Sequence, residues 1–237
     1  MIGIIDVHCH ILSGVDDGAK TLEESKKMLE MEYAQGVRTI IATPHYRRHM
    51  FQYSKEKVEE QYKQLQEVAA KVGDGLKLVL GCEYYAEQDM VERLNNDKCY
   101  TIAGTRHVLT EFSSATEYSF MRECIYALIS NGYIPIIAHV ERYVALKKNQ
   151  IKELVELGAL MQLNADSILG KKGHKVKKFC QNMMKEDLLN FVGTDAHGIR
   201  ERAPRIAKCA RYVEKKMGQD YAQKIFINNP AEILKID

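Results

Sequence analysis

The sequence predicts an α/β protein in which helices cover a parallel sheet. Seven short apolar runs alternate along the chain with longer amphipathic stretches, and parallel strands that are buried on both faces have this appearance. A barrel and a doubly wound sheet both satisfy the pattern. No linker rich in Pro, Gly or Ser interrupts the alternation, so we expect residues 1–237 to form one domain.

The expected strands are brief runs rich in β-branched residues or leucine, which is typical of buried strands. In chain order they are residues 2–8, 38–43, 76–81, 107–112, 134–139, 159–164 and 189–194. Each is followed by a segment long enough to hold the helix that a parallel connection requires.

Side chains that cap helix ends set the expected helix boundaries. Thr21 with Glu24 fits a capping box, and Gly36 is placed to end that helix. Ser54 predicts the start of a long charged helix that ends near Gly73. The other expected helices run from Ser114 or Thr116 to Gly132, from Asn149 to Gly158, over residues 203–217, and over residues 230–234 with Asn229 as N-cap.

Composition excludes several classes of protein. The 34 basic and 32 acidic residues leave a net charge of only +2, and no arginine-rich stripe is present, so nucleic acid is not the expected partner. The apolar runs are too short for membrane insertion, and polar residues interrupt the N-terminus before a signal peptide forms. We therefore expect a cytoplasmic protein, in which the six cysteines, none in a C-x-x-C pair, are reduced thiols.

Potential metal ligands stand at the ends of the predicted strands. His8 and His10 close the first strand, and residues at i and i+2 of an extended chain point to the same face. The side chains at the later strand ends are His45, Glu83, Glu111, His139, Asn164, and Asp195 with His197. Because the carboxyl ends of parallel strands open on one face of a barrel, we expect these groups to meet there.

Such a cluster of imidazoles and carboxylates needs cations to balance it. The sequence therefore predicts a multinuclear metal site. A mixed nitrogen and oxygen donor set without cysteine suits Mn, Fe or Zn ions. Cys9 lies between two of the histidines and is expected to face away from them.

Other catalytic patterns are missing from the sequence. None of the six cysteines is followed six positions later by arginine, so a cysteine-dependent phosphatase is excluded. The chain also has no G-x-S-x-G elbow and no phosphate-binding loop of the G-x-x-x-x-G-K-[ST] type. The predicted active site is therefore the metal site.

Five motifs together resemble the PHP (polymerase and histidinol phosphatase) superfamily. They are Asp6-Val7-His8-Cys9-His10, Asp16-Asp17-Gly18, Thr43-Pro44-His45, Ala138-His139-Val140-Glu141-Arg142 and Thr194-Asp195-Ala196-His197. The chain is most similar to the bacterial branch of metal-dependent protein-tyrosine phosphatases of capsular and exopolysaccharide synthesis. The resemblance runs nearly end to end and includes Asn228-Asn229-Pro230.

The resemblance implies a distorted seven-stranded (β/α) barrel of the TIM-like PHP type, holding three divalent ions, usually Mn²⁺. It implies one ion on His8, His10, Glu83 and Asp195, a second on Glu83, Glu111 and His139, and a third on Asp17, His45 and His197. Asp16 is the alternative to Asp17. Arg142 and Arg202 match positions that bind phosphate, with Arg200 as a neighbouring competitor, and Arg47 and Arg48 follow His45 closely enough to meet an anionic substrate.

The implied activity is hydrolysis of phosphotyrosine on proteins by attack of a metal-bound hydroxide on phosphorus. The implied partner is a phosphotyrosine-containing protein, namely a bacterial tyrosine kinase of capsule synthesis. Two alternatives stay open. One is a small-molecule phosphatase of the histidinol-phosphate type, and the other is a non-catalytic module that retains the ligands for stability.

Overall fold

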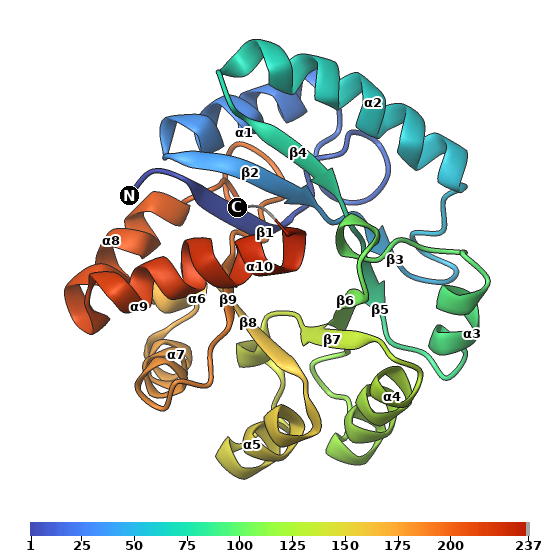
Figure 1. The fold of residues 1–237 in the computed structure, drawn as a ribbon, viewed down its shortest axis with the longest axis vertical. Coiled ribbons are helices and arrows are strands. Elements are labelled where there is room, and N and C mark those ends of the chain that lie inside the picture. The colour runs from blue at the N-terminus through green and yellow to red at the C-terminus, as the bar shows by residue number, and fades with distance from the viewer. Residues whose placement is uncertain (236–237) are drawn as a thin grey trace.

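The computed structural model describes residues 1–235 and has a ring of parallel strands surrounded by helices (Figure 1). All pairings between its strands are parallel. The strands are β1 (Ile4–Cys9), β2 (Val37–Ala42), β3 (His45–Tyr46), β4 (Lys77–Leu80), β5 (Glu83–Tyr85), β6 (His107–Glu111), β7 (Ile134–Ile137), β8 (Leu160–Asn164) and β9 (Phe191–Gly193). The predicted α/β class, with a parallel sheet covered by helices, is confirmed.

The predicted count of seven strands is not confirmed, because residues 1–235 contain nine short strands in two sheets. One sheet has the order β1-β2-β4 and the other has the order β3-β5-β6-β7-β8-β9. The second predicted run stops before Pro44, which has no N–H to donate to a ladder, and the chain resumes as β3 in the other sheet. The third run makes the same change of sheet at Gly81, between β4 and β5.

The end of β1 lies beside the chain that follows β9. The amide of Asp195 donates to the carbonyl of His8 at 2.8 Å, and the amide of His10 donates to the carbonyl of Ala196 at 2.9 Å. These bonds connect the first and last strands, so that the two sheets together surround a common interior (Figure 1).

Helices cover the outside of the strands (Figure 1). They are α1 (Leu22–Ala34), α2 (Lys55–Val72), α3 (Met90–Asn95), α4 (Tyr118–Ser130), α5 (Lys148–Leu157), α6 (Ala165–Ile168), α7 (His174–Lys185), α8 (Ile206–Met217), α9 (Gln219–Gln223) and α10 (Asn229–Leu234), with short 3₁₀ turns η1 (Ile102–Gly104) and η2 (Val140–Arg142) and a π-helical segment η3 (Lys224–Asn228). Among residues 1–235, no helix combines the length and the apolar character needed to cross a membrane.

Two of the predicted helix starts are confirmed by hydrogen bonds. The Thr21 hydroxyl accepts from the amide of Glu24 at 3.2 Å, and the Ser54 hydroxyl accepts from the amide of Lys57 at 3.3 Å. Each satisfies an amide that the first turn of a helix leaves without a partner.

Three other predicted starts are wrong. The N-cap of α4 is Glu117 instead of Ser114 or Thr116, and the N-cap of α5 is Lys147 instead of Asn149. Asn229 is not an N-cap, because η3 continues directly into α10 with helical backbone angles. A residue type that commonly caps helices is therefore not enough to fix where a helix begins, because the conformation of the neighbouring turn also sets the boundary.

The end of the ring opposite the carboxyl ends of the strands is closed by apolar packing. Ile233 of α10 belongs to an apolar cluster with Ile5, Val7, Ile41 and Phe191, which come from β1, β2 and β9. This cluster fills the interior from the amino-terminal side, and the histidine and carboxylate cluster described below lies at the carboxyl ends of the strands. A larger apolar layer lies between the strands and the outer helices.

The packing of α4 gives a test of this outer layer. Leu128 is fully buried, and Leu128→Ala is expected to lower the free energy of unfolding by about 2–5 kcal/mol, because the lost methyl groups leave a cavity. Urea unfolding with a chelator present measures the change without a contribution from metal. The control is Tyr126→Ala on the same helix, where 57% of the side chain is exposed and a change within about 0.5 kcal/mol is expected. Equal effects of the two substitutions would contradict the assignment of the buried face.

Candidate metal centre

The structure brings all nine predicted metal ligands into one cluster at the carboxyl ends of the strands. Each has a nitrogen or oxygen atom within 3.6 Å of one from another member. The members are His8, His10, Asp17, His45, Glu83, Glu111, His139, Asp195 and His197. Eight of the nine lie at or follow strand ends, as the sequence analysis expected, and Asp17, which the family resemblance implied, comes from the loop between β1 and α1.

Glu83 lies at the centre of the cluster. Its Oε2 lies 3.2 Å from Nε2 of His8, 3.1 Å from Nε2 of His10 and 3.0 Å from Nδ1 of His45. Its Oε1 lies 2.8 Å from Nε2 of His139. His8 and His10 present Nε2 atoms 3.1 Å apart, as expected for side chains at i and i+2 of a strand.

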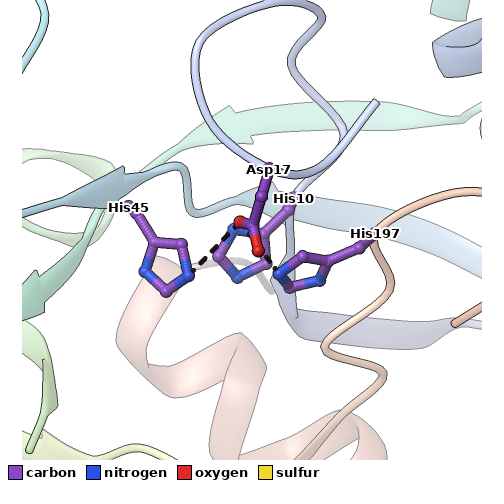
Figure 2. A group of neighbouring side chains, drawn as sticks. All are labelled: His10, Asp17, His45 and His197. Atoms are coloured by element: carbon purple, nitrogen blue, oxygen red, sulfur yellow. Dashed lines mark ion pairs between the residues drawn. The ribbon is translucent and has the colours of Figure 1, made fainter. Parts of the chain in front are cut away.

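A second group of ligands lies beside the first (Figure 2). Asp17 Oδ1 is 3.6 Å from Nε2 of His45 and 3.4 Å from Nε2 of His197, and His10 completes the group. His45 thus faces Glu83 with one ring nitrogen and Asp17 with the other. This imidazole connects the two groups.

The two neighbouring aspartates have different positions. Asp17 points into the group of Figure 2, whereas the Asp16 carboxylate makes hydrogen bonds to backbone amides. The Asp16 carboxylate accepts from the amides of Gly18 at 2.8 Å and His45 at 2.9 Å, and it lies 2.7 Å from Nδ1 of His10. Asp16 therefore orients the imidazole of His10, and the geometry favours Asp17 as the ligand.

Sharp turns of the backbone aim two further ligands. His139 follows β7 with φ of 33°, and Asp195 follows β9 with φ of 51°. Positive φ is uncommon for residues other than glycine. These turns direct the imidazole and the carboxylate inward at the points where the strands end.

The donor set fits divalent cations. Oε2 of Glu83 and Nδ1 of His45 lie 3.0 Å apart, and Nε2 of His197 lies 3.4 Å from Asp17, yet none of these three buried atoms makes a hydrogen bond of acceptable geometry within residues 1–235. Buried polar atoms normally have partners, so three unsatisfied lone-pair donors in one cluster require an explanation. Imidazole nitrogens and carboxylate oxygens are ligands that Mn, Fe and Zn ions accept.

Burial and neighbouring charges shift the pKa values of several clustered side chains. Burial alone would raise the pKa of Glu83, but the imidazoles of His8 and His45 hold it well below its usual range. Burial alone would also lower the pKa of His10, yet the Asp16 carboxylate raises it to about 10. Burial, together with the charge of Arg142, lowers the pKa of His139 to about 4.

The pKa of Glu111 shows that two carboxylates of the cluster repel each other. Burial and the neighbouring charge of Glu83 raise its pKa to about 7. Two carboxylates that compete in this way are stabilised in their ionised forms by a bound cation.

Several imidazoles are held in place by side chains that sequence reasoning missed. Gln162 Oε1 lies 3.3 Å from Nδ1 of His8 and accepts from the amide of His139 at 2.7 Å. The Tyr143 hydroxyl lies 3.3 Å from Nδ1 of His139. Contacts of this kind leave Nε2 free to face the cluster. A glutamine inside the apolar run of β8 was a visible signal, but no local pattern marks Tyr143.

The two predicted phosphate-binding arginines both contact Asp195. A guanidinium nitrogen of Arg202 donates to Asp195 Oδ1 at 2.8 Å, and Arg142 donates to Oδ2. Asn164, the remaining strand-end residue, donates to Oδ2 at 2.7 Å. Both arginine side chains are partly exposed, whereas Asp195 is buried. The arginines therefore lie between the cluster and solvent.

The other predicted arginines lie farther from the ligands. The Arg47 guanidinium lies over the ring of Tyr85, and Arg48 pairs with Glu87 and Asp89. Within residues 1–235, Arg200 makes a hydrogen bond only through its backbone carbonyl, which accepts from the guanidinium of Arg205. Arg202 rather than Arg200 therefore reaches the site.

A parallel α/β fold with histidine and carboxylate donors gathered at its strand ends is typical of metal-dependent enzymes. The family model described as "Capsular polysaccharide synthesis, CpsB/CapC" matches residues 4–235. The chain belongs to this family, and the resemblance drawn from its motifs is confirmed.

Relatives and solved structures agree with this placement. The chain is 36% identical over 238 residues to the tyrosine-protein phosphatase CpsB of Streptococcus pneumoniae, with 98% of both chains covered. It is 31% identical to the tyrosine-protein phosphatase YwqE of Bacillus subtilis, covering 98% of this chain and 91% of the relative. A crystal structure from work on YwqE and CpsB, described as unique metal-dependent tyrosine phosphatases, superposes with a TM-score of 0.90 at 30% identity, covering 98% and 94% of the chains.

A more distant structure shares the fold alone. The phosphotriesterase homology protein of Escherichia coli gives a TM-score of 0.63 at 13% identity, with 98% of both chains covered. The same arrangement of strands and helices therefore also occurs in proteins with little sequence similarity to this chain.

Removal of divalent ions tests the cluster. Ions that bind only the folded state stabilise it, and a free concentration 100-fold above Kd adds about 2.7 kcal/mol. We expect Mn²⁺ to raise the melting temperature of chelator-treated protein, as measured by calorimetry. Glu83→Gln, which removes the central charge, is expected to abolish most of this rise. Identical melting curves with and without Mn²⁺ would exclude a manganese site in this cluster.

Proposed function

We propose that the chain hydrolyses phosphotyrosine on proteins, with three divalent ions, foremost Mn²⁺, held by the nine clustered ligands. Its relatives are tyrosine-protein phosphatases, and a structure from work on two of them, described as metal-dependent, superposes along almost the whole chain. The observation that carries the proposal is the buried carboxylate of Glu83 among four imidazoles.

The proposed ligand sets are those implied by the motifs. His8, His10, Glu83 and Asp195 hold one ion, Glu83, Glu111 and His139 hold a second, and Asp17, His45 and His197 hold a third. The central position of Glu83 supports its role in two sets. The proximity of Asp17 to His45 and His197 supports the third set.

When bound, the ions supply an activated water nucleophile and Lewis-acid stabilisation of phosphoryl charge. Arg142 and Arg202 bind the phosphoryl oxygens from the solvent side, because guanidinium groups match the geometry of phosphate. A phenolate leaving group has a pKa near 10, so its departure asks less of a general acid than an alkoxide does.

The cysteines support a route without a thiolate. All six are free and buried. Burial raises the pKa of the Cys9 and Cys82 thiols well above their ordinary values, and a thiol rather than a thiolate is a poor nucleophile. Burial of the thiols and the absence of arginine six positions after each cysteine therefore both argue against a cysteine nucleophile.

The biological setting is proposed from the family. Its description refers to capsular polysaccharide synthesis, and we propose a bacterial tyrosine kinase of that process as the cytoplasmic partner. We also propose that residues 1–237, of which 236–237 lie outside the described part, form one domain. In this domain β2 with β3, and β4 with β5, each act as one interrupted strand of a seven-stranded barrel.

Substrate preference tests the activity. Protein stripped with a chelator and reloaded with Mn²⁺ is expected to hydrolyse a phosphotyrosyl peptide with a kcat/KM at least about tenfold above that for histidinol phosphate. A phosphoseryl peptide with the same flanking residues is expected to be slower, because it lacks the phenolate leaving group. Glu83→Gln, purified in parallel, controls for contaminating phosphatases and is expected to be inactive. A strong preference for histidinol phosphate would contradict the proposal.

The Asp16–Asp17 pair tests the ligand sets. Asp17→Asn is expected to reduce the metal content from three ions to two, as measured by elemental analysis after gel filtration. Asp16→Asn is expected to keep three ions but to weaken affinity by about 10- to 100-fold, because the imidazole of His10 loses its orienting partner. The reverse pattern would assign the ligand role to Asp16.

A further inference from the structure

A short hairpin stands beside the metal centre, immediately after β3. The amide of Arg47 donates to the carbonyl of Phe51 at 2.9 Å, and the amide of Phe51 donates to the carbonyl of Arg47 at 2.8 Å. His49 at its tip has φ of 63°, the left-handed conformation that a tight turn uses. Residues 47–51 are called the β3 hairpin below.

The β3 hairpin is fastened to the neighbouring chain by its arginines. The Arg47 guanidinium lies 4.1 Å from the centre of the Tyr85 ring, and Tyr85 is paired in register with Glu111. Arg48 forms ion pairs with Glu87 and Asp89. These contacts attach the hairpin to β5 and to the segment that follows it.

Phe51 is the hairpin side chain that touches the cluster. Its ring stacks on the imidazole of His45, with centroids 5.3 Å apart and planes 8° from parallel. Within residues 1–235, the other aromatic side chain whose ring contacts a ligand is Tyr143, beside His139. Tyr143 is buried, whereas Phe51 is partly exposed. Of these two ring contacts, only that of Phe51 is made by a side chain that an incoming molecule can reach.

We propose that Phe51 receives the aromatic ring of the substrate and so contributes to the choice of phosphotyrosine over phosphoserine. The inference rests on the proposed phosphotyrosine activity. In phosphotyrosine the ring is bonded directly to the bridging phosphate oxygen, so a phosphorus atom at the ligands places the ring within a few ångströms of His45. Phe51 lies at that distance and offers an apolar aromatic surface. A phosphoseryl side chain brings no ring to it.

A purely supporting role for Phe51 makes a different prediction. If the ring only holds the imidazole of His45, its loss weakens metal binding and affects every phosphate ligand alike. If the ring receives the substrate, its loss affects the aromatic substrate selectively. Inorganic phosphate, as a competitive inhibitor without a ring, separates these two roles.

The experiment compares Phe51→Leu, Phe51→Tyr and wild-type protein, each loaded with Mn²⁺. Aromatic pairs contribute enough that Phe51→Leu is expected to lower kcat/KM for a phosphotyrosyl peptide by about three- to tenfold. The inhibition constant for inorganic phosphate and the metal content are expected to change less than about twofold over the same range. Phe51→Tyr, which keeps the ring, is expected to restore most of the loss. Tyr126→Leu, an exposed aromatic on α4, is the matched control and is expected to have no effect.

Two results would overturn the inference. One is an unchanged kcat/KM for the phosphotyrosyl peptide in Phe51→Leu. The other is a parallel loss of peptide turnover, phosphate inhibition and bound metal, which would assign Phe51 a supporting role. Wild-type protein that does not hydrolyse the phosphotyrosyl peptide at all would instead overturn the proposed function, and this inference with it.

Discussion

A fully buried carboxylate surrounded by imidazoles is the constraint on which the site depends. Glu83 has no exposed surface and lies within 3.2 Å of nitrogens from four histidines. Charges removed from water are tolerated only when they are paired or bound to metal. The positions of Gln162, Tyr143 and Asp16 follow from this constraint, because each fixes an imidazole or the backbone near it.

The fold meets the constraint by interrupting its strands. The chain leaves one sheet and enters the other between β2 and β3 and again between β4 and β5, and His45 and Glu83 stand at the first residues after these breaks. The two residues are direct neighbours in the register of β3 and β5. At the opposite end, Ile233 and its apolar neighbours close the interior. Polar chemistry and apolar packing are thus separated along the axis of the strands.

The gathering of the strand-end side chains could be predicted from the sequence because it depends on local rules, whereas Asp17 was expected only from the family resemblance. His8 and His10 follow from the two-residue period of a strand, and the later ligands follow from the common edge at which parallel strands end. The division of two predicted strands, the wrong cap at Asn149 and the contact of Tyr143 with His139 depend on residues distant in sequence or on the neighbouring turn. Phe51 reaches His45 only because the β3 hairpin folds back, and no periodic pattern marks that turn.

Asp195 accepts from both arginines and also lies 3.6 Å or less from the imidazoles of His8 and His10. An ion bound there would compete with the guanidinium groups for the charge of the same carboxylate. An ion on Asp195 would therefore free arginine N–H groups for a bound anion, and thermodynamic reciprocity requires that the anion raise the affinity for that ion by the same factor. Loading of the metal and capture of the phosphate would then be two parts of one coupled equilibrium.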